Sequence, residues 1–149
     1  MAKRVTTKVR VPAQASANAD VKIKTYPRHT SEFEKVRQGL TFMAYDKKAS
    51  SDRETFFVDN GSKVGLSAIE VEISYFNLDG KLIHKRVVEV RQDFPALETR
   101  KVDITSWDRQ KSFHYINSVP SNKGSAPYTV RFKVISFTEA YPNQLVTDK

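Results

Sequence analysis

One segment, residues 67–76, constrains the fold of this 149-residue chain more than any other. Its apolar and polar side chains alternate without a break, with Ile69, Val71, Ile73 and Tyr75 in one register and Glu70, Glu72 and Ser74 in the other. Successive side chains of a β-strand point to opposite faces of the sheet, whereas a helix repeats every 3.6 residues. The segment therefore predicts a strand with one buried and one solvated face, which is typical of an antiparallel sheet.

The next residues predict a hairpin. Asn77-Leu-Asp-Gly80 follows the strand directly, and Gly80 stands where a left-handed residue closes a tight turn. Residues 81–90 are rich in β-branched side chains and should return antiparallel to residues 67–76. Neither register of this second strand is cleanly apolar. We therefore expect it at the edge of its sheet or interrupted by a bulge.

Shorter strands are predicted along the rest of the chain. They cover residues 5–11, 21–26, 39–45, 55–59, 99–106, 113–117 and 128–137. One helical turn is expected at residues 31–37, where Ser31 and Glu34 form a capping-box pattern. Seven to nine short strands with frequent turn signals favour an all-β fold, an antiparallel immunoglobulin-like β-sandwich. We expect a basic N-terminal arm or strand at residues 1–28 and one sandwich domain at residues 29–149.

Four motifs resemble immunoglobulin-like modules of the FxLYD type. They are Val58-Asp-Asn-Gly-Ser62, Ile69-Glu-Val-Glu-Ile73, Asn77-Leu-Asp-Gly80 and Phe94-Pro-Ala-Leu-Glu-Thr99. The resemblance covers about residues 53–137 and departs from the family at Leu97, where these modules usually have Gly. It implies a sandwich fold and a place in an envelope, a secreted protein or a surface. The motifs mark turns and strand ends, so they say little about activity.

The sequence contains no pattern for catalysis or metal binding. The chain has no Cys, which excludes disulfides, thiolate metal sites and cysteine nucleophiles. Its three histidines, His29, His84 and His114, are too far apart in the sequence for a chelating motif. The five glycines form no nucleotide-binding loop. We therefore expect a protein that is not an enzyme, with no metal site and no cofactor.

The positive charge is concentrated near the N-terminus. The net charge is +8, and residues 1–50 hold 11 Lys and Arg against 4 Asp and Glu. The candidate partner-binding residues are Lys3, Arg4, Lys8, Arg10, Lys22, Lys24 and Arg28. Such a segment attracts acidic proteins or nucleic acid, and salt weakens the attraction. Alternatively, its cations make a strand soluble and protect a sheet edge.

The segment 106–117 mixes aromatic and basic residues most densely and forms a second candidate site. Its candidate ligand-binding residues are Trp107, Arg109, Lys111 and Tyr115. The aromatic rings could stack on a sugar or a base, and the cations could bind acidic groups. The structural alternative is that Trp107 covers the open end of the sandwich and Tyr115 is an ordinary strand residue. Loops at the end of a sandwich are where a binding site would lie.

These observations favour a non-enzymatic interaction module, a structural or accessory component of a larger assembly such as a cell envelope or a virion surface. Its partner would be another protein or a second copy of the chain. The alternative is a nucleic-acid-associated protein that contacts phosphates through residues 1–28. No apolar run reaches the roughly 18 residues of a transmembrane helix. No export signal is recognised, and the sequence does not indicate a compartment.

Overall fold

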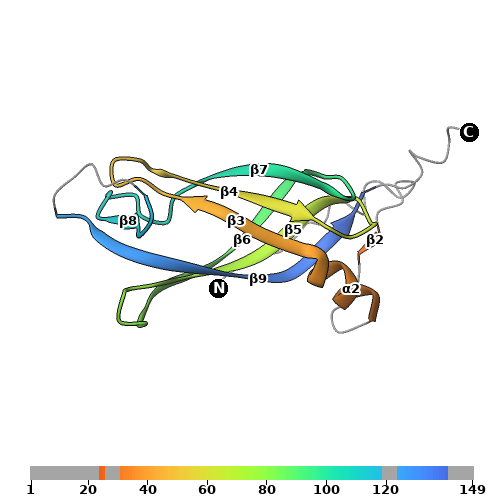
Figure 1. The fold of residues 1–149 in the computed structure, drawn as a ribbon, viewed down its shortest axis with the longest axis horizontal. Helices are drawn as coiled ribbons and strands as arrows, with labels where there is room; N and C mark the ends of the chain where they lie inside the picture. The colour runs from red at the N-terminus through yellow and green to blue at the C-terminus, as the bar shows by residue number, and fades with distance from the viewer. Residues whose placement is uncertain (1–23, 26–30, 119–123, 141–149) are drawn as a thin grey trace, which may run out of the picture.

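The computed structural model describes residues 24–25, 31–118 and 124–140, which form two β-sheets and one short helix. The first sheet has the order β2 (Lys24–Thr25), β9 (Ala126–Glu139), β5 (Leu66–Phe76), β6 (Leu82–Phe94), and β8 (Phe113–Tyr115) also pairs with β9. The second sheet has the order β3 (Leu40–Asp46), β4 (Arg53–Asn60), β7 (Glu98–Thr105). Figure 1 shows the two sheets as the layers of an elongated body. The prediction of an all-β fold is confirmed.

The predicted hairpin is formed by β5 and β6. The two strands are antiparallel, with Ile73 opposite Arg86 and Val71 opposite Val88. Gly80 closes the turn with a φ of 86°, a backbone angle that L side chains rarely adopt. β6 lies at the end of the sheet order, which explains why neither of its registers is uniformly apolar.

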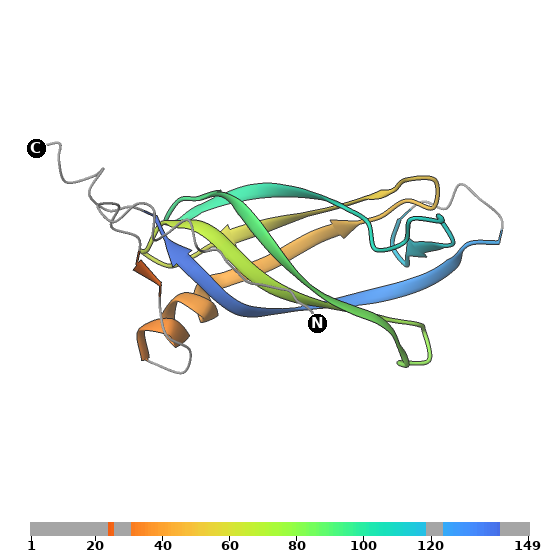
Figure 2. The same cartoon turned by 180° about the vertical axis from the view of Figure 1, so that it is seen from behind.

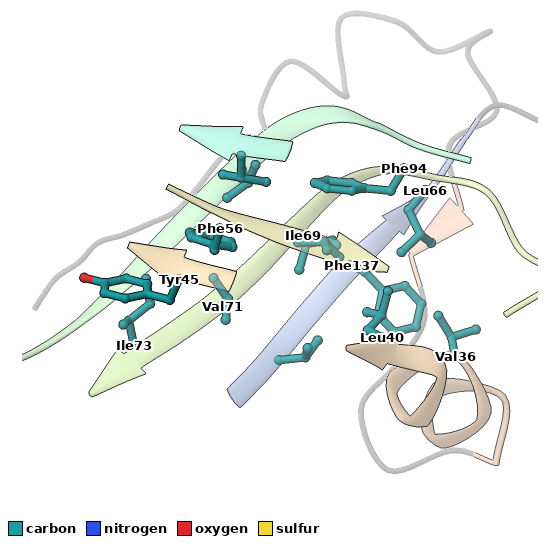
Figure 3. Close-up of a cluster of buried hydrophobic side chains, with 14 of the residues drawn as sticks. Val36, Leu40, Tyr45, Phe56, Leu66, Ile69, Val71, Ile73, Phe94 and Phe137 are labelled. Carbon is teal, nitrogen blue, oxygen red and sulfur yellow. The ribbon is translucent and has the colours of Figure 1, made fainter. Parts of the chain in front are cut away.

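The hydrophobic core lies between the two sheets and is built around β5. Its alternate side chains Ile69, Val71, Ile73 and Tyr75 are at most 1% exposed. Figure 3 shows Ile69, Val71 and Ile73 facing side chains of the second sheet, among them Phe56 of β4. Burying an aliphatic or aromatic side chain of this size stabilises a fold by about 1.5–3 kcal/mol. The alternation that predicted the strand therefore also identifies its buried face.

A β-bulge in β3 directs Tyr45 into the core. Met43 pairs with Phe57 and Asp46 with Thr55, so two residues of β3 stand opposite one residue of β4. The extra residue is accommodated by Ala44, whose φ is 56°. Tyr45 is buried, and its hydroxyl lies 2.7 Å from the hydroxyl of Tyr128 in β9. This hydrogen bond joins the two sheets inside the core.

Helix α2 (Ser31–Gly39) lies at one end of the body, where Figure 1 shows it next to β2. The ring of Phe33 in this helix stacks on the ring of Phe137 in β9, with the centroids 5.0 Å apart, and Val36 is buried. The capping-box pattern predicts that the carboxylate of Glu34 binds the N-terminus of this helix. In the structure, that carboxylate accepts a 3.0 Å hydrogen bond from Nε of Arg37. No described helix is long and apolar enough to cross a membrane.

Side chains connect the sheets along both of their open sides. On one side, β6 donates to backbone oxygens of β7: Gln92 Nε2 to Lys101 and Arg86 Nη2 to Thr105, each at 3.0 Å. On the other side, Phe42 of β3 stacks on Phe132 of β9 with the centroids 4.7 Å apart. The two layers are therefore held together beyond the core itself.

Candidate interaction surface

Most of the N-terminal candidate residues lie outside the described residues. These are Lys3, Arg4, Lys8, Arg10, Lys22 and Arg28. The backbone of Lys24 is described: Lys24 lies in β2 and pairs with Glu139 of β9. β2 lies beside α2, at the opposite end of the body from β8 (Figure 1). The structure therefore does not bring Lys24 together with the candidate residues of segment 107–115.

The second candidate site includes a loop between β7 and β8, residues 107–112, which we call the tip loop. It lies at the end of the body opposite α2, where the turn between β5 and β6 also projects (Figure 2). A shallow depression of about 290 Å³ is lined by Trp107, Asp108, Arg109, Gln110, Ser112 and Phe113. Arg109, Gln110 and Lys111 are exposed. The structure therefore brings three of the four predicted residues, Trp107, Arg109 and Lys111, into one loop.

A buried ion pair holds the tip loop. The Nζ atom of Lys47 lies 2.9 Å from Oδ2 of Asp108, and these residues are 1% and 5% exposed. Asp108 also accepts hydrogen bonds from the backbone amides of Ser112 at 2.9 Å and Phe113 at 2.7 Å. Burial raises the pKa of Asp108, but these amides and Lys47 outweigh it and hold the pKa below its usual value. Asp108 is therefore a charged organiser of the loop.

The backbone of the tip loop is turned tightly around Asp108. The Asp108 amide donates to Oγ of Ser106 at 2.9 Å, and the Lys111 amide donates to the carbonyl oxygen of Asp108 at 3.2 Å. Lys111 has a φ of 59°, which for a residue other than Gly costs about 1 kcal/mol or more. The contacts around Asp108 stabilise this conformation and fix where Arg109 and Lys111 stand.

Tyr115 has a structural position rather than an exposed one. Its ring packs edge-on against Tyr45, with the centroids 4.9 Å apart, and its amide donates to the carbonyl oxygen of Lys47 at 3.0 Å. The Lys47 amide donates to Oγ of Ser118 at 3.2 Å, and that hydroxyl donates to Asp46. These bonds attach β8 to the end of β3. Tyr115 is half-buried and supports the tip loop through these contacts.

Trp107 is packed among other rings, as the structural alternative expects. Its ring centroid lies 4.8 Å from that of Tyr75 and 5.0 Å from that of Phe113, and it stacks on His84 at 5.2 Å. The residue is half-buried and forms one wall of the depression. Trp107 therefore anchors the tip loop to the sandwich and leaves only part of its ring accessible.

A second buried polar cluster, centred on Glu54, lies next to Trp107. Glu54 is fully buried and accepts hydrogen bonds from Tyr75 Oη at 2.8 Å, Arg86 Nη2 at 3.0 Å and the Trp107 backbone amide at 2.8 Å. Burial and the charge of Glu54 raise the pKa of Tyr75, so its phenol stays protonated. This cluster was not predicted from the sequence. The sequence does contain one indication of it, because Glu54 shares a strand register with the apolar residues Phe56 and Val58.

Arg109 differs from the other described arginines in having no partner. The others contact a carboxylate or a ring: Arg37 with Glu34, Arg53 with Asp103, Arg86 with Glu54, Arg91 with Glu89, Arg100 with Glu98 and Arg131 over Phe76. Within the described part of the chain, the Arg109 guanidinium makes no hydrogen bond, ion pair or ring contact. Its binding capacity is therefore available to another molecule.

Neither metal-site geometry nor known proteins assign a function to these residues. In residues 24–25, 31–118 and 124–140, no three His, Asp or Glu side chains are grouped so that they could hold a metal ion. No family model, no curated protein and no solved structure matches the chain.

Proposed function

We propose that this protein is a non-enzymatic interaction module, an immunoglobulin-like β-sandwich with a basic N-terminal arm, that serves as a structural or accessory component of a larger assembly. The charge distribution carries the proposal. Residues 1–28 hold seven Lys and Arg against one Asp, whereas residues 31–118 and 124–140 hold 16 Lys and Arg against 15 Asp and Glu. A nearly neutral body joined to a strongly charged N-terminal segment of the sequence suits a module that is recruited to an acidic partner.

The use of the buried charged groups supports the same proposal. The buried charged residues in the described part of the chain are Lys47, Glu54 and Asp108. Each is bonded to groups of its own fold, in the Lys47–Asp108 pair or the Glu54 cluster. Groups used in this way stabilise the fold and hold the tip loop. The surface then supplies the contacts, through the N-terminal segment, the loops at the tip and the sheet edges.

The test is deletion of residues 1–19 from the full chain, with a matched variant in which Lys3, Arg4, Lys8 and Arg10 are changed to Gln. We expect the deleted protein to keep its circular dichroism spectrum and melting temperature but to lose its native partner in affinity capture. The Gln variant keeps the length of the N-terminal segment but removes four of its positive charges, so it tests whether the charge is what partner capture requires. Capture of the same partner by the deletion variant at unchanged yield would overturn the role of the arm.

A second candidate function is nucleic-acid binding, and the net charge of +6 on residues 1–28 favours it. Contacts to phosphates need only positive charge, and they release counterions. Labelled DNA and RNA should then bind at 50 mM salt and bind about 100-fold or more weakly at 200 mM. Failure to bind at 50 mM salt would eliminate this candidate.

A further inference from the structure

We propose that the tip loop is a second contact site, which binds a carboxylate of an acidic partner segment through Arg109 and Lys111 and an adjacent apolar side chain in the depression beside Trp107. The inference rests on the proposed function, that the protein binds other proteins. It adds a site at the end of the body opposite β2 and names the chemistry of what that site takes.

The first argument is the unpartnered guanidinium of Arg109. Six described arginines contact a carboxylate or a ring of this chain, and Arg109 does not. Arg presents its donors as a planar fork that fits the two oxygens of a carboxylate. Lys111 is exposed two residues further on and adds a second positive charge. A carboxylate is therefore the ligand group that these side chains suit.

The second argument is that the fold fixes the loop in advance. Burying the Lys47 and Asp108 charges costs desolvation free energy. The ion pair and the two amide hydrogen bonds that compensate this cost all involve Asp108, and they hold residues 108–113 in place. A loop that is already ordered loses less conformational entropy when it binds. The negative charge of Asp108 does not repel an acidic ligand strongly, because Lys47 balances it and two backbone amides donate hydrogen bonds to it.

The third argument is the depression next to the cations. Trp107 and Phe113 supply apolar rings to its lining, and Gln110 and Ser112 supply polar groups. Its volume of about 290 Å³ and its open shape suit one side chain rather than a whole ligand. A carboxylate on Arg109 would place a neighbouring aliphatic or aromatic residue at these rings. The partner segment we expect is therefore acidic with interspersed apolar residues.

Trp107 provides the reporter, because it is the only Trp in the chain and lines the depression. The full-length protein is titrated with a blocked hexapeptide of alternating Glu and Leu, with the same peptide carrying Gln for Glu, and with inorganic phosphate. We expect a saturable change in Trp emission with the Glu peptide that weakens as salt is added. The Gln peptide should bind at least tenfold more weakly.

The variants assign the signal to the tip loop. Arg109→Ala should weaken binding of the Glu peptide about tenfold or more, and Arg109→Lys should restore only part of it because it lacks the fork. Lys111→Gly removes the charge at a position with positive φ and should weaken binding by a smaller factor. Arg100→Ala is the matched control, since Arg100 is an exposed arginine that pairs with Glu98.

Three outcomes would overturn the inference: equal binding of the Gln peptide, equal effects of Arg109→Ala and Arg100→Ala, or a saturable response to phosphate with none to the peptide. The Gln variant of Lys3, Arg4, Lys8 and Arg10 should keep the Trp response, which excludes binding of the peptide to the N-terminal segment as its source. If the tip loop fails while deletion of residues 1–19 still abolishes partner capture, only this inference is wrong. The reverse result would reject the proposed role of the arm and keep the site.

Discussion

The Nζ atom of Lys47 lies 2.9 Å from Oδ2 of Asp108, although the two residues are 61 positions apart and both are buried. This contact joins the end of β3 to the tip loop, and it is the only link between the two that involves opposite charges in the described residues. Removing one partner leaves the other charged and without compensation in the protein interior, which is strongly unfavourable.

Lys47→Met should therefore lower the free energy of unfolding by about 3–5 kcal/mol. Urea denaturation measures this change. Arg53→Ala is the control, because Arg53 and Asp103 form an exposed ion pair with side chains 47% and 53% accessible. That variant should lose about 1 kcal/mol or less. Equal losses in the two variants would show that the buried pair has no special importance.

The same carboxylate predicts how stability depends on acid. The pKa of Asp108 is lower in the folded protein than in the unfolded chain, so its contribution to stability is complete above the unfolded value of about 3.9. The contribution is lost as the pH falls through the folded pKa. Melting temperatures measured from pH 6 to pH 2 should thus fall less steeply for Asp108→Asn than for the wild type. Parallel profiles would contradict the prediction.

His84 should titrate in a way that Trp107 reports. Burial, and then the charge of Arg86, lower the pKa of His84, while Glu54 opposes them. The folded protein disfavours the charged imidazole, so stability is complete above about pH 6.5 and decreases as the pH falls through the folded pKa. Because His84 stacks on Trp107, its protonation should change the Trp emission in the same range. His84→Gln should abolish this transition and His114→Gln should retain it.

Leu97 should be replaceable by Gly with a gain in stability. It is 66% exposed and has a φ of 63°, so its side chain contributes little burial while its backbone is strained. Gly adopts this left-handed conformation without the steric strain of a side chain, so the replacement should add about 0.5–1 kcal/mol to the free energy of unfolding. Thr41→Gly is the control at an exposed strand position of β3, and it should lose stability. Denaturant titrations compare the two, and a loss in both would contradict the prediction.

The elements that could be predicted from the sequence are those defined by local pattern. The alternation of residues 67–76 identified β5 and its buried face, and Gly80 identified the hairpin turn. The mixed registers of residues 81–90 were consistent with the edge position that β6 has in its sheet. In each case the determining contacts involve neighbouring residues or the periodicity of one strand. The predicted strand at residues 5–11 lies outside the described residues.

The interactions that could not be predicted join distant segments. Nothing near Lys47 in the sequence indicates Asp108, and the parallel pairing of β8 with β9 depends on how the whole chain folds back. Asp108 was not identified as the organiser of the tip loop, because a carboxylate next to two cations is typical of a solvated loop. Arg109 and Lys111 were identified by composition. Only the partners of the other arginines show that Arg109 is the one left without a contact.

β9 also has a mechanical consequence. Residues 126–128 pair with β8, residues 138–139 pair with β2, and most of the strand between them pairs with β5. Sliding β9 lengthwise past β5 would load the hydrogen bonds between these two long strands in shear, all at once, instead of peeling them apart one at a time. Lengthwise separation of β9 from β5 should therefore need a larger force than peeling β9 away from one end.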